Sequence, residues 1–311
     1  MLATNRRTVV VLVHGGAIDV SALLTTQEEE GSVPGTGGNG GVPAILDGHY
    51  AGQMGGDAIM RTLLNYQGAA PAGRLTTTVY RNDFTTLRNM TDMSMHNITY
   101  KHYTGNAVFP FGWGLSYSRF QVTWANSDSS DSTADIGVRG EDGGSSDSVL
   151  PPSKTVNTTD MLESHAEYFA ARARGDLQWA SPAAYSAVVT NVGNITSDFV
   201  LLGFISSPAR VSADPQEPLR ELFDFARVRA LAPGISANVT LSVPAAVMSH
   251  VDDRGNERLR SGNYVVQLGG RWLGDEGGGL RAQLRLVGED QMLFSLQESQ
   301  ARYEQHQRQQ R

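Results

Sequence analysis

A stretch rich in serine, aspartate and glycine, residues 126–154, divides this chain of 311 residues into two parts with different sequence patterns. Such a stretch cannot bury enough apolar surface to offset the conformational entropy that ordering would cost. We therefore expect a disordered insertion here, with a separate hydrophobic core on either side. Two domains also agree with the usual domain size of roughly 100–200 residues.

The first part, residues 1–120, has the pattern of an α/β domain. A β-branched run at residues 8–13 predicts a strand that is buried on both faces. Apolar side chains recur at helical spacing over residues 54–66, and Gly68 with Pro71 ends that predicted helix. Two further short strands are predicted at residues 43–46 and 75–80, with a glycine-rich insert at residues 31–41 between the first two strands.

The second part has short apolar runs separated by turn residues, which predict the strands 185–190, 199–205, 237–243, 264–268 and 280–287. In residues 280–287 apolar and polar side chains alternate, as in a strand with one buried face. Several such strands predict a β-sandwich. Residues 161–174 have helical composition.

The expected domain organisation follows from these patterns. It comprises a partial α/β domain, a low-complexity insertion and linker, a β-sandwich and a tail rich in glutamine and arginine: residues 1–120, 121–184, 185–290 and 291–311.

Composition excludes several classes of partner and site. The formal net charge is −7 with a pI near 5.5 and no basic stripe, so nucleic acid is not an expected partner. No apolar run approaches the roughly 18 residues that a membrane span needs. The absence of cysteine excludes disulfides, thiolate metal sites and a cysteine nucleophile.

Two local motifs resemble known ligand-binding or catalytic motifs but lack the neighbouring elements that those motifs require. Residues 35–40 fit the dinucleotide template G-x-G-x-x-G, but they lie in a loop that leads into a strand, which favours a flexible insert. His14 with the next two glycines is similar to a lipase oxyanion loop, yet the run 114–118 around Ser116 lacks the second glycine of the nucleophile elbow. A plain turn is therefore expected after the first strand.

Charged and metal-binding residue types give no stronger candidate. Glu28, Glu29 and Glu30 are expected to be a solvated charge run beside the glycine-rich insert rather than a general acid. The seven histidines, including His96 and His102, lack the spacing of a known metal-binding motif. We therefore expect neither a metal site nor a cofactor.

Five Asn-x-Thr sequons are possible glycan acceptors: Asn89, Asn97, Asn157, Asn194 and Asn238. The alternation of residues 237–243 places Asn238 on the solvent face of its strand. No signal peptide is recognisable, because the apolar run 9–13 is short and meets His14. The sequons favour an extracellular or secretory location, with the N-terminus lost.

Four segments of the first part, in order, resemble the C-terminal domain of glycoside hydrolase family 3. They are the strand leading to Gly-Gly-Ala-Ile-Asp-Val-Ser (15–21), the run 44–56 containing Gly-Gln-Met-Gly-Gly, the run 68–78 containing Gly-Arg-Leu, and Phe-Pro-Phe-Gly-Trp-Gly-Leu-Ser-Tyr-Ser-Arg-Phe (109–120). The segments 189–193, 219–228, 231–234 and 261–264 resemble the fibronectin type III-like module that follows in many members. The sequence of residues 89–95 looks closest to that of β-xylosidases, and β-glucosidases share most of it.

The resemblance implies a retaining exo-β-glycosidase that acts on β-linked xylo- or gluco-oligosaccharides without a cofactor. In the family the nucleophilic aspartate lies on a (β/α)8 barrel, and the acid/base glutamate lies upstream of the strand matched here by residues 8–13. The chain is therefore expected to be a C-terminal fragment with no catalytic residue of its own. The barrel is the expected missing partner.

Three positions depart from the family pattern. Asp47 replaces a tryptophan, Ala51 a proline and Ile98 an arginine, and these changes would weaken contacts with sugars. Two alternatives to a truncated enzyme stay open. The chain is a non-catalytic remnant that binds carbohydrate or a partner, or it pairs in trans with a separately encoded barrel through an exposed half-sheet.

Overall fold

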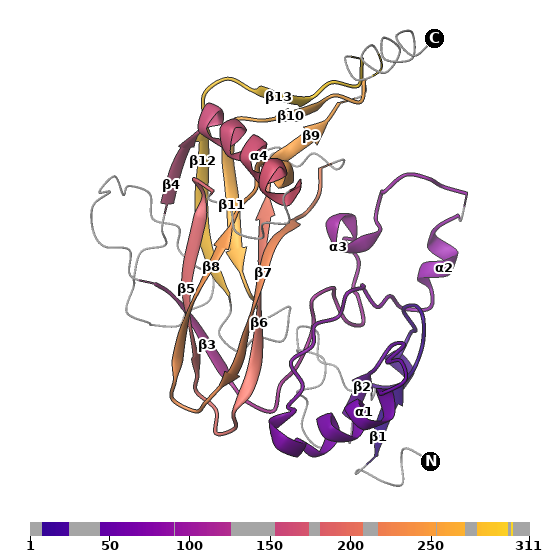
Figure 1. Ribbon diagram of the computed structural model, residues 1–311. Helices are drawn as coiled ribbons and strands as arrows, with labels where there is room; N and C mark the ends of the chain where they lie inside the picture. The colour runs from indigo at the N-terminus through magenta and orange to yellow at the C-terminus, as the bar shows by residue number, and fades with distance from the viewer. Residues whose placement is uncertain are drawn as a thin grey trace, which may run out of the picture.

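The computed structural model describes residues 8–24, 44–89, 91–125, 153–173, 181–207, 217–252, 254–270, 279–297 and 300. Figure 1 shows a group formed by β1, β2 and α1 at one end of the molecule and a set of long sandwich strands beside it. The predicted order, an α/β part followed by an all-β part, is confirmed. The glycine-rich insert and Glu28 to Glu30 lie outside the described residues.

The α/β part is built on one parallel strand pair. β1 (Val9–Leu12) pairs with β2 (Ala44–Asp47), with Leu12 opposite Asp47 at the end of the ladder. α1 (Gly55–Leu64) follows and ends at Asn65, which has a left-handed φ of 48°. The remaining helical turns of this part are short: η2 (Ser21–Leu23), η3 (Tyr66–Gly68), α2 (Phe84–Leu87) and α3 (Thr99–His102).

The prediction that the first strand is buried on both faces is wrong. Val9 and Val11 of β1 are 44% and 37% exposed, and Val13 just beyond the strand is 64% exposed. The reason is that, among the described residues, the sheet has two strands and β1 pairs with β2 alone. An apolar strand face is therefore left uncovered.

The strand predicted at residues 75–80 is also absent from the described sheets. This segment forms hydrogen bonds with residues 108–113 instead. Leu75 N–H donates to Trp113 O at 2.8 Å, and one bridge joins Val79 to Phe109. Val79 packs with Val20 in a small separate core.

The second part is a sandwich of two main sheets. One sheet has five strands in the order β4-β12-β11-β6-β7, which are Ser153–Asn157, Leu280–Val287, Gly262–Leu268, Ser197–Ser206 and Glu221–Leu231. The other has three strands in the order β3-β5-β8, which are Phe120–Trp124, Ala184–Asn191 and Ser236–Ser242. A small third sheet has the strand order β13-β10-β9, which are Gln291–Phe294, Glu257–Leu259 and Ser249–Val251. The turn η4 (Ala245–Met248) directly precedes β9.

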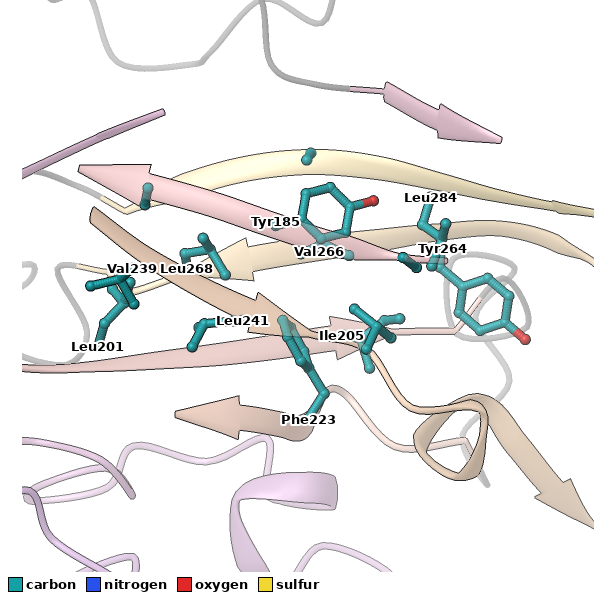
Figure 2. Close-up of a cluster of buried hydrophobic side chains, with 14 of the residues drawn as sticks. Tyr185, Leu201, Ile205, Phe223, Val239, Leu241, Tyr264, Val266, Leu268 and Leu284 are labelled. Atoms are coloured by element: carbon teal, nitrogen blue, oxygen red, sulfur yellow. The ribbon is translucent and has the colours of Figure 1, made fainter. Parts of the chain in front are cut away.

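The core of the sandwich lies between the two main sheets, and Figure 2 shows its side chains meeting there from both sides. Tyr185 of β5 is 1% exposed, and its hydroxyl donates to Gln283 O of β12 at 3.2 Å. In β12 the apolar residues are buried or half-buried while Arg281 and Arg285 are exposed, as the alternation predicted. All five strands predicted in this part are present, each within a residue or two of its expected start.

Two segments of the predicted linker belong to the sandwich. β3 pairs antiparallel with β5, and β4 pairs parallel with β12, with Leu284 opposite Lys154. The composition of residues 126–154 concealed the start of β4, because Ser153 and Lys154 are polar edge residues whose partner lies far along the chain. α4 (Thr158–Ala173) follows β4 and confirms the helical composition of this region.

Candidate functional site

The carboxyl ends of β1 and β2 bring three ionisable side chains together. His14 follows β1, Asp47 ends β2 and His49 lies two residues further on. His14 Nε2 lies 3.1 Å from Asp47 Oδ1, and His49 Nε2 lies 3.7 Å from the same oxygen. The carboxyl edge of a parallel sheet is where α/β folds usually bind ligands, so this cluster is the first candidate site.

The backbone holds the three side chains in place. Gly48 N–H donates to Leu12 O at 3.0 Å, which ties the end of β2 to the end of β1. His49 N–H donates to Asp47 Oδ1 at 3.1 Å, and the φ of His49 is 44°. This left-handed conformation, unfavourable for most side chains, turns His49 back over the carboxylate.

Burial distinguishes this cluster from a surface group. The side chain of His14 is 8% exposed and that of Asp47 is 17% exposed, whereas that of His49 is 37% exposed. Within the described part of the chain, His14 Nδ1 and His49 Nε2 are buried and have no hydrogen-bond partner. The ligand atoms of the three residues lie within 4.8 Å of one another, and imidazole nitrogens with a carboxylate oxygen are common ligands of divalent metals.

Among the residues that the structure describes, His96, His102 and the serine motif do not assemble a catalytic group. His96 is exposed, and His102 lies in α3. Ser116 Oγ lies 3.1 Å from Ser197 Oγ and accepts a hydrogen bond from Ser118 N–H at 3.2 Å. These contacts give Ser116 a structural role at the start of the sandwich.

The carboxylate in the motif 15–21 also has a structural role. Asp19 accepts hydrogen bonds from Ser21 N–H and Asn82 N–H, each at 2.8 Å. Partial burial opposes its ionisation, but these hydrogen bonds outweigh the burial, so the pKa of Asp19 lies below its ordinary value. An ionised carboxylate that fastens the loop after β1 to Asn82 is a poor proton donor.

A second buried acid lies in the sandwich. Glu217 is 5% exposed and receives Arg260 Nη1 and His250 Nδ1, each at 2.8 Å from Oε1. Ser207 Oγ donates to its other oxygen at 3.1 Å. Because both oxygens have donors, we assign Glu217 to an internal ion-pair network.

The motif around Tyr100 forms the junction between the two parts of the chain. The Tyr100 ring stacks on Phe111 with centroids 4.2 Å apart, and both rings contact Phe204 of β6. The Tyr100 hydroxyl accepts a hydrogen bond from Leu222 N–H at 3.2 Å. Since its ring face is covered, Tyr100 acts in packing rather than as a platform for a sugar.

The five sequon asparagines differ in exposure. Asn89, Asn157, Asn194 and Asn238 are exposed, and Asn238 lies on the outer face of β8 as its alternation predicted. Asn97 is half-buried, with a φ of 53°, and its Oδ1 accepts hydrogen bonds from the Thr104 N–H and hydroxyl at 3.0 and 3.1 Å. The geometry therefore favours the four exposed asparagines as glycan acceptors over Asn97.

Comparison with known proteins gives two family matches. Residues 1–117 match the model of the glycosyl hydrolase family 3 C-terminal domain, and residues 200–271 match that of the fibronectin type III-like domain. The exo-1,4-β-xylosidase bxlB of Emericella nidulans is 30% identical over 268 residues, which are 84% of this chain and 28% of that protein. The chain thus spans little more than a quarter of this relative's length.

Solved structures show the same fold. A GH3 exo-β-xylosidase (XlnD), solved with a xylobiose aziridine probe, aligns over 93% of this chain and 32% of its own, with a TM-score of 0.68 and 24% identity. The β-D-glucoside glucohydrolase of Trichoderma reesei aligns over 91% of this chain and 34% of its own, with a TM-score of 0.59 and 20% identity. In the part of our chain that the structure describes, no helix has the length and apolar character needed to cross a bilayer.

Proposed function

Since this chain carries the C-terminal α/β domain and the fibronectin type III-like domain of glycoside hydrolase family 3, we propose that it serves a retaining exo-β-glycosidase as its C-terminal portion. The observation that carries this proposal is similarity across both domains at once. The match to an exo-1,4-β-xylosidase runs through 84% of the chain, so the pairing of domains is preserved as well as each domain.

We propose that the catalytic carboxylates are supplied by polypeptide outside these 311 residues. A retaining glycosidase needs two carboxyl groups about 5–5.5 Å apart, one acting as nucleophile and one as acid/base. The buried or partly buried acids Asp19 and Glu217 are instead held by hydrogen bonds and ion pairs. This supports a structural contribution of the chain to catalysis.

The uncovered face of β1 suggests that further strands of the same enzyme pack against it. These strands are joined to this chain covalently or bind it non-covalently. Val9, Val11 and Val13 are exposed, and a two-stranded sheet is marginally stable by itself. We propose that the remaining strands of the family α/β domain cover these valines. They belong either to the same polypeptide or to a separately encoded chain that carries the barrel.

Xylo-oligosaccharides are the substrate class that we propose. The relative at 30% identity is named an exo-1,4-β-xylosidase, whereas the glucosidase structures support the fold alone. The four exposed sequons support passage through a secretory pathway. Intact mass before and after glycosidase treatment of protein from its native source tests that location, and an unmodified chain would contradict it.

A second candidate is a non-catalytic protein that binds carbohydrate or a partner chain. The replacement of tryptophan, proline and arginine by Asp47, Ala51 and Ile98 favours a non-catalytic role, because it weakens the sugar contacts that an active enzyme needs. It also favours a partner chain over carbohydrate as the bound molecule. A measurable affinity for xylobiose without turnover would distinguish this candidate from a truncated enzyme.

A xylose-configured aziridine probe tests the proposed function in material from the native source. The probe labels a nucleophilic carboxylate covalently, and peptide mass spectrometry locates the adduct. We expect the labelled protein or complex to contain peptides of residues 1–311. The adduct itself should lie outside these residues. An adduct within these residues would contradict the proposal, and the absence of any labelled protein containing them would favour the binding function.

A further inference from the structure

We propose that His14, Asp47 and His49 form a binding site for one divalent transition metal ion, with zinc as the expected occupant. This inference does not depend on the proposed glycosidase function. The sequence predicted no metal site, because the spacing of the three residues matches no known motif. The parallel pairing of β1 and β2 brings them together.

The separations of the ligand atoms suit a small ion. Two ligand atoms bound to zinc at 2.0–2.1 Å in a tetrahedral arrangement lie about 3.3–3.4 Å apart. The two distances from Asp47 Oδ1, 3.1 Å to His14 Nε2 and 3.7 Å to His49 Nε2, lie on either side of that value. The three ligand atoms lie within 4.8 Å of one another, so side-chain rotations that bring the two imidazoles closer together would place all three around one ion.

The unsatisfied nitrogen of His49 points to a ligand of this kind. His14 Nδ1 and His49 Nε2 are buried without a hydrogen-bond partner among the described residues. A buried polar atom left unpaired costs about 1–3 kcal/mol, and natural proteins seldom leave one so. At His49 a bound cation would give the free nitrogen a partner, and the carboxylate would offset part of the added charge.

The two imidazole rings lie close enough to share a ligand. The centroids of His14 and His49 are 4.8 Å apart and the rings are tilted by 55°. One nitrogen of each ring lies within 3.7 Å of the same carboxylate oxygen.

The donor set selects the class of metal. Two nitrogens with one carboxylate oxygen suit zinc and related divalent transition metals, whereas magnesium and calcium prefer oxygen ligands throughout. With no cysteine in the chain, no thiolate competes for the ion. Zinc is therefore expected to bind here and magnesium is not.

Metal binding would fasten the two strands together at their carboxyl ends. At this edge Gly48 N–H already bonds to Leu12 O at 3.0 Å. An ion held by His14 from one strand and by Asp47 and His49 from the other adds a second link. Since binding to the folded state alone stabilises it, zinc should raise the melting temperature of the α/β part.

The test is zinc titration by calorimetry of the full chain, freed of any affinity-tag histidines and stripped with EDTA, with thermal unfolding on the same sample. Cobalt(II) replaces zinc for visible absorption, which reports imidazole ligation directly. The variants are Asp47→Asn and His49→Asn, together with His14→Gln. Asparagine tolerates the left-handed backbone of His49, so that variant should fold even if the buried His14→Gln does not. The exposed His96→Gln is the matched control.

We expect the wild type to bind one equivalent of zinc per chain. Zinc should raise the melting temperature, and magnesium should leave it unchanged. The ligand variants that fold should bind zinc more than about tenfold more weakly. His96→Gln should bind as the wild type does. The proposal is overturned if the wild type shows no saturable binding, if magnesium gives the same stabilisation, or if Asp47→Asn and His49→Asn both retain wild-type affinity.

Discussion

Lys101 Nζ lies 2.7 Å from Glu221 Oε1, and this ion pair links the α/β part of the chain to the first residue of β7. The backbone reinforces the link, because Leu219 N–H donates to Lys101 O at 2.5 Å. With the Tyr100 contacts beside it, one short segment of the α/β part docks on the sandwich. The two parts therefore meet through a specific set of contacts rather than a loose linker.

A double-mutant cycle of Lys101→Met and Glu221→Gln measures what the ion pair contributes. Both side chains are about one-third exposed, so we expect a coupling of about 0.5–1 kcal/mol that falls at high salt. Urea unfolding at low and high ionic strength gives the values. A coupling near zero, or one that 1 M salt leaves unchanged, would contradict this interpretation.

Arg74 is the second link across the junction. Its Nη1 donates to Gly114 O at 2.9 Å, its Nη2 donates to Val200 O of β6 at 3.2 Å, and the guanidinium lies over the Phe199 ring. The backbone at Gly114 lies so close to that at Gly73 that a Cβ at Gly114 would overlap the Gly73 carbonyl oxygen. Position 114 therefore requires glycine.

Arg74→Lys should cost about 1–2 kcal/mol, because an ammonium cannot reproduce a planar fork that reaches two carbonyls. Arg61→Lys on the exposed face of α1 is the control, with an expected cost below about 0.5 kcal/mol. Equal costs for the two substitutions, measured by urea unfolding, would show that the bridging geometry contributes nothing.

Asn191 is a buried polar side chain of the sandwich whose amide nitrogen and oxygen both have partners. It is fully buried, and its Nδ2 donates to Ile195 O at 2.8 Å and to Leu231 O at 2.7 Å. Its Oδ1 accepts from Ser118 Oγ at 2.7 Å and from Gly193 N–H at 3.0 Å. One side chain thus joins the end of β7 to the loop that enters β3.

Asn191→Ala should destabilise the sandwich by about 3 kcal/mol or more, since it leaves several buried groups unpaired. The exposed Asn194→Ala, three residues away, should change stability by less than about 0.5 kcal/mol. Thermal unfolding followed by circular dichroism compares them. Similar melting temperatures for the two variants would disprove the assigned role of Asn191.

The ionised Asp198 side chain should account for part of the loss of folding stability at acidic pH. Partial burial opposes its ionisation, but the Ala230 N–H at 2.7 Å and the Arg227 guanidinium at 2.6 Å outweigh it and hold the pKa of Asp198 below its ordinary value. Its contribution to stability is therefore present above the unfolded pKa near 3.8 and is lost as pH falls through the lower folded pKa. Urea unfolding between pH 7 and pH 3 should show a shallower loss for Asp198→Asn than for the wild type, and parallel curves would refute the assignment.

The elements that the sequence predicted well are those with a local pattern. The alternation in β12 and β8 and the helical spacing of α1 each depend on residues close together in the chain. The short strands β9, β10 and β13 were missed, because three or four residues carry too little periodicity. The predicted strand at residues 75–80 failed because its hydrogen bonds go to a neighbouring loop and not to a sheet.

The candidate site was missed for a different reason. His14 lies more than thirty residues from Asp47 and His49, and only the register that sets Leu12 opposite Asp47 makes them neighbours. A signal was nevertheless present. A histidine follows one predicted strand, and an Asp-x-His sequence follows the next.

The central proposal is that these residues support a family 3 glycosidase without supplying its catalytic carboxylates. The most direct measurement is the release of p-nitrophenol from its β-xyloside and β-glucoside by the purified chain, with circular dichroism on the same sample. We predict a folded, strand-rich spectrum and no turnover above the uncatalysed rate. Turnover that follows the folded protein through purification would contradict the account, since it would require a catalytic pair within the 311 residues.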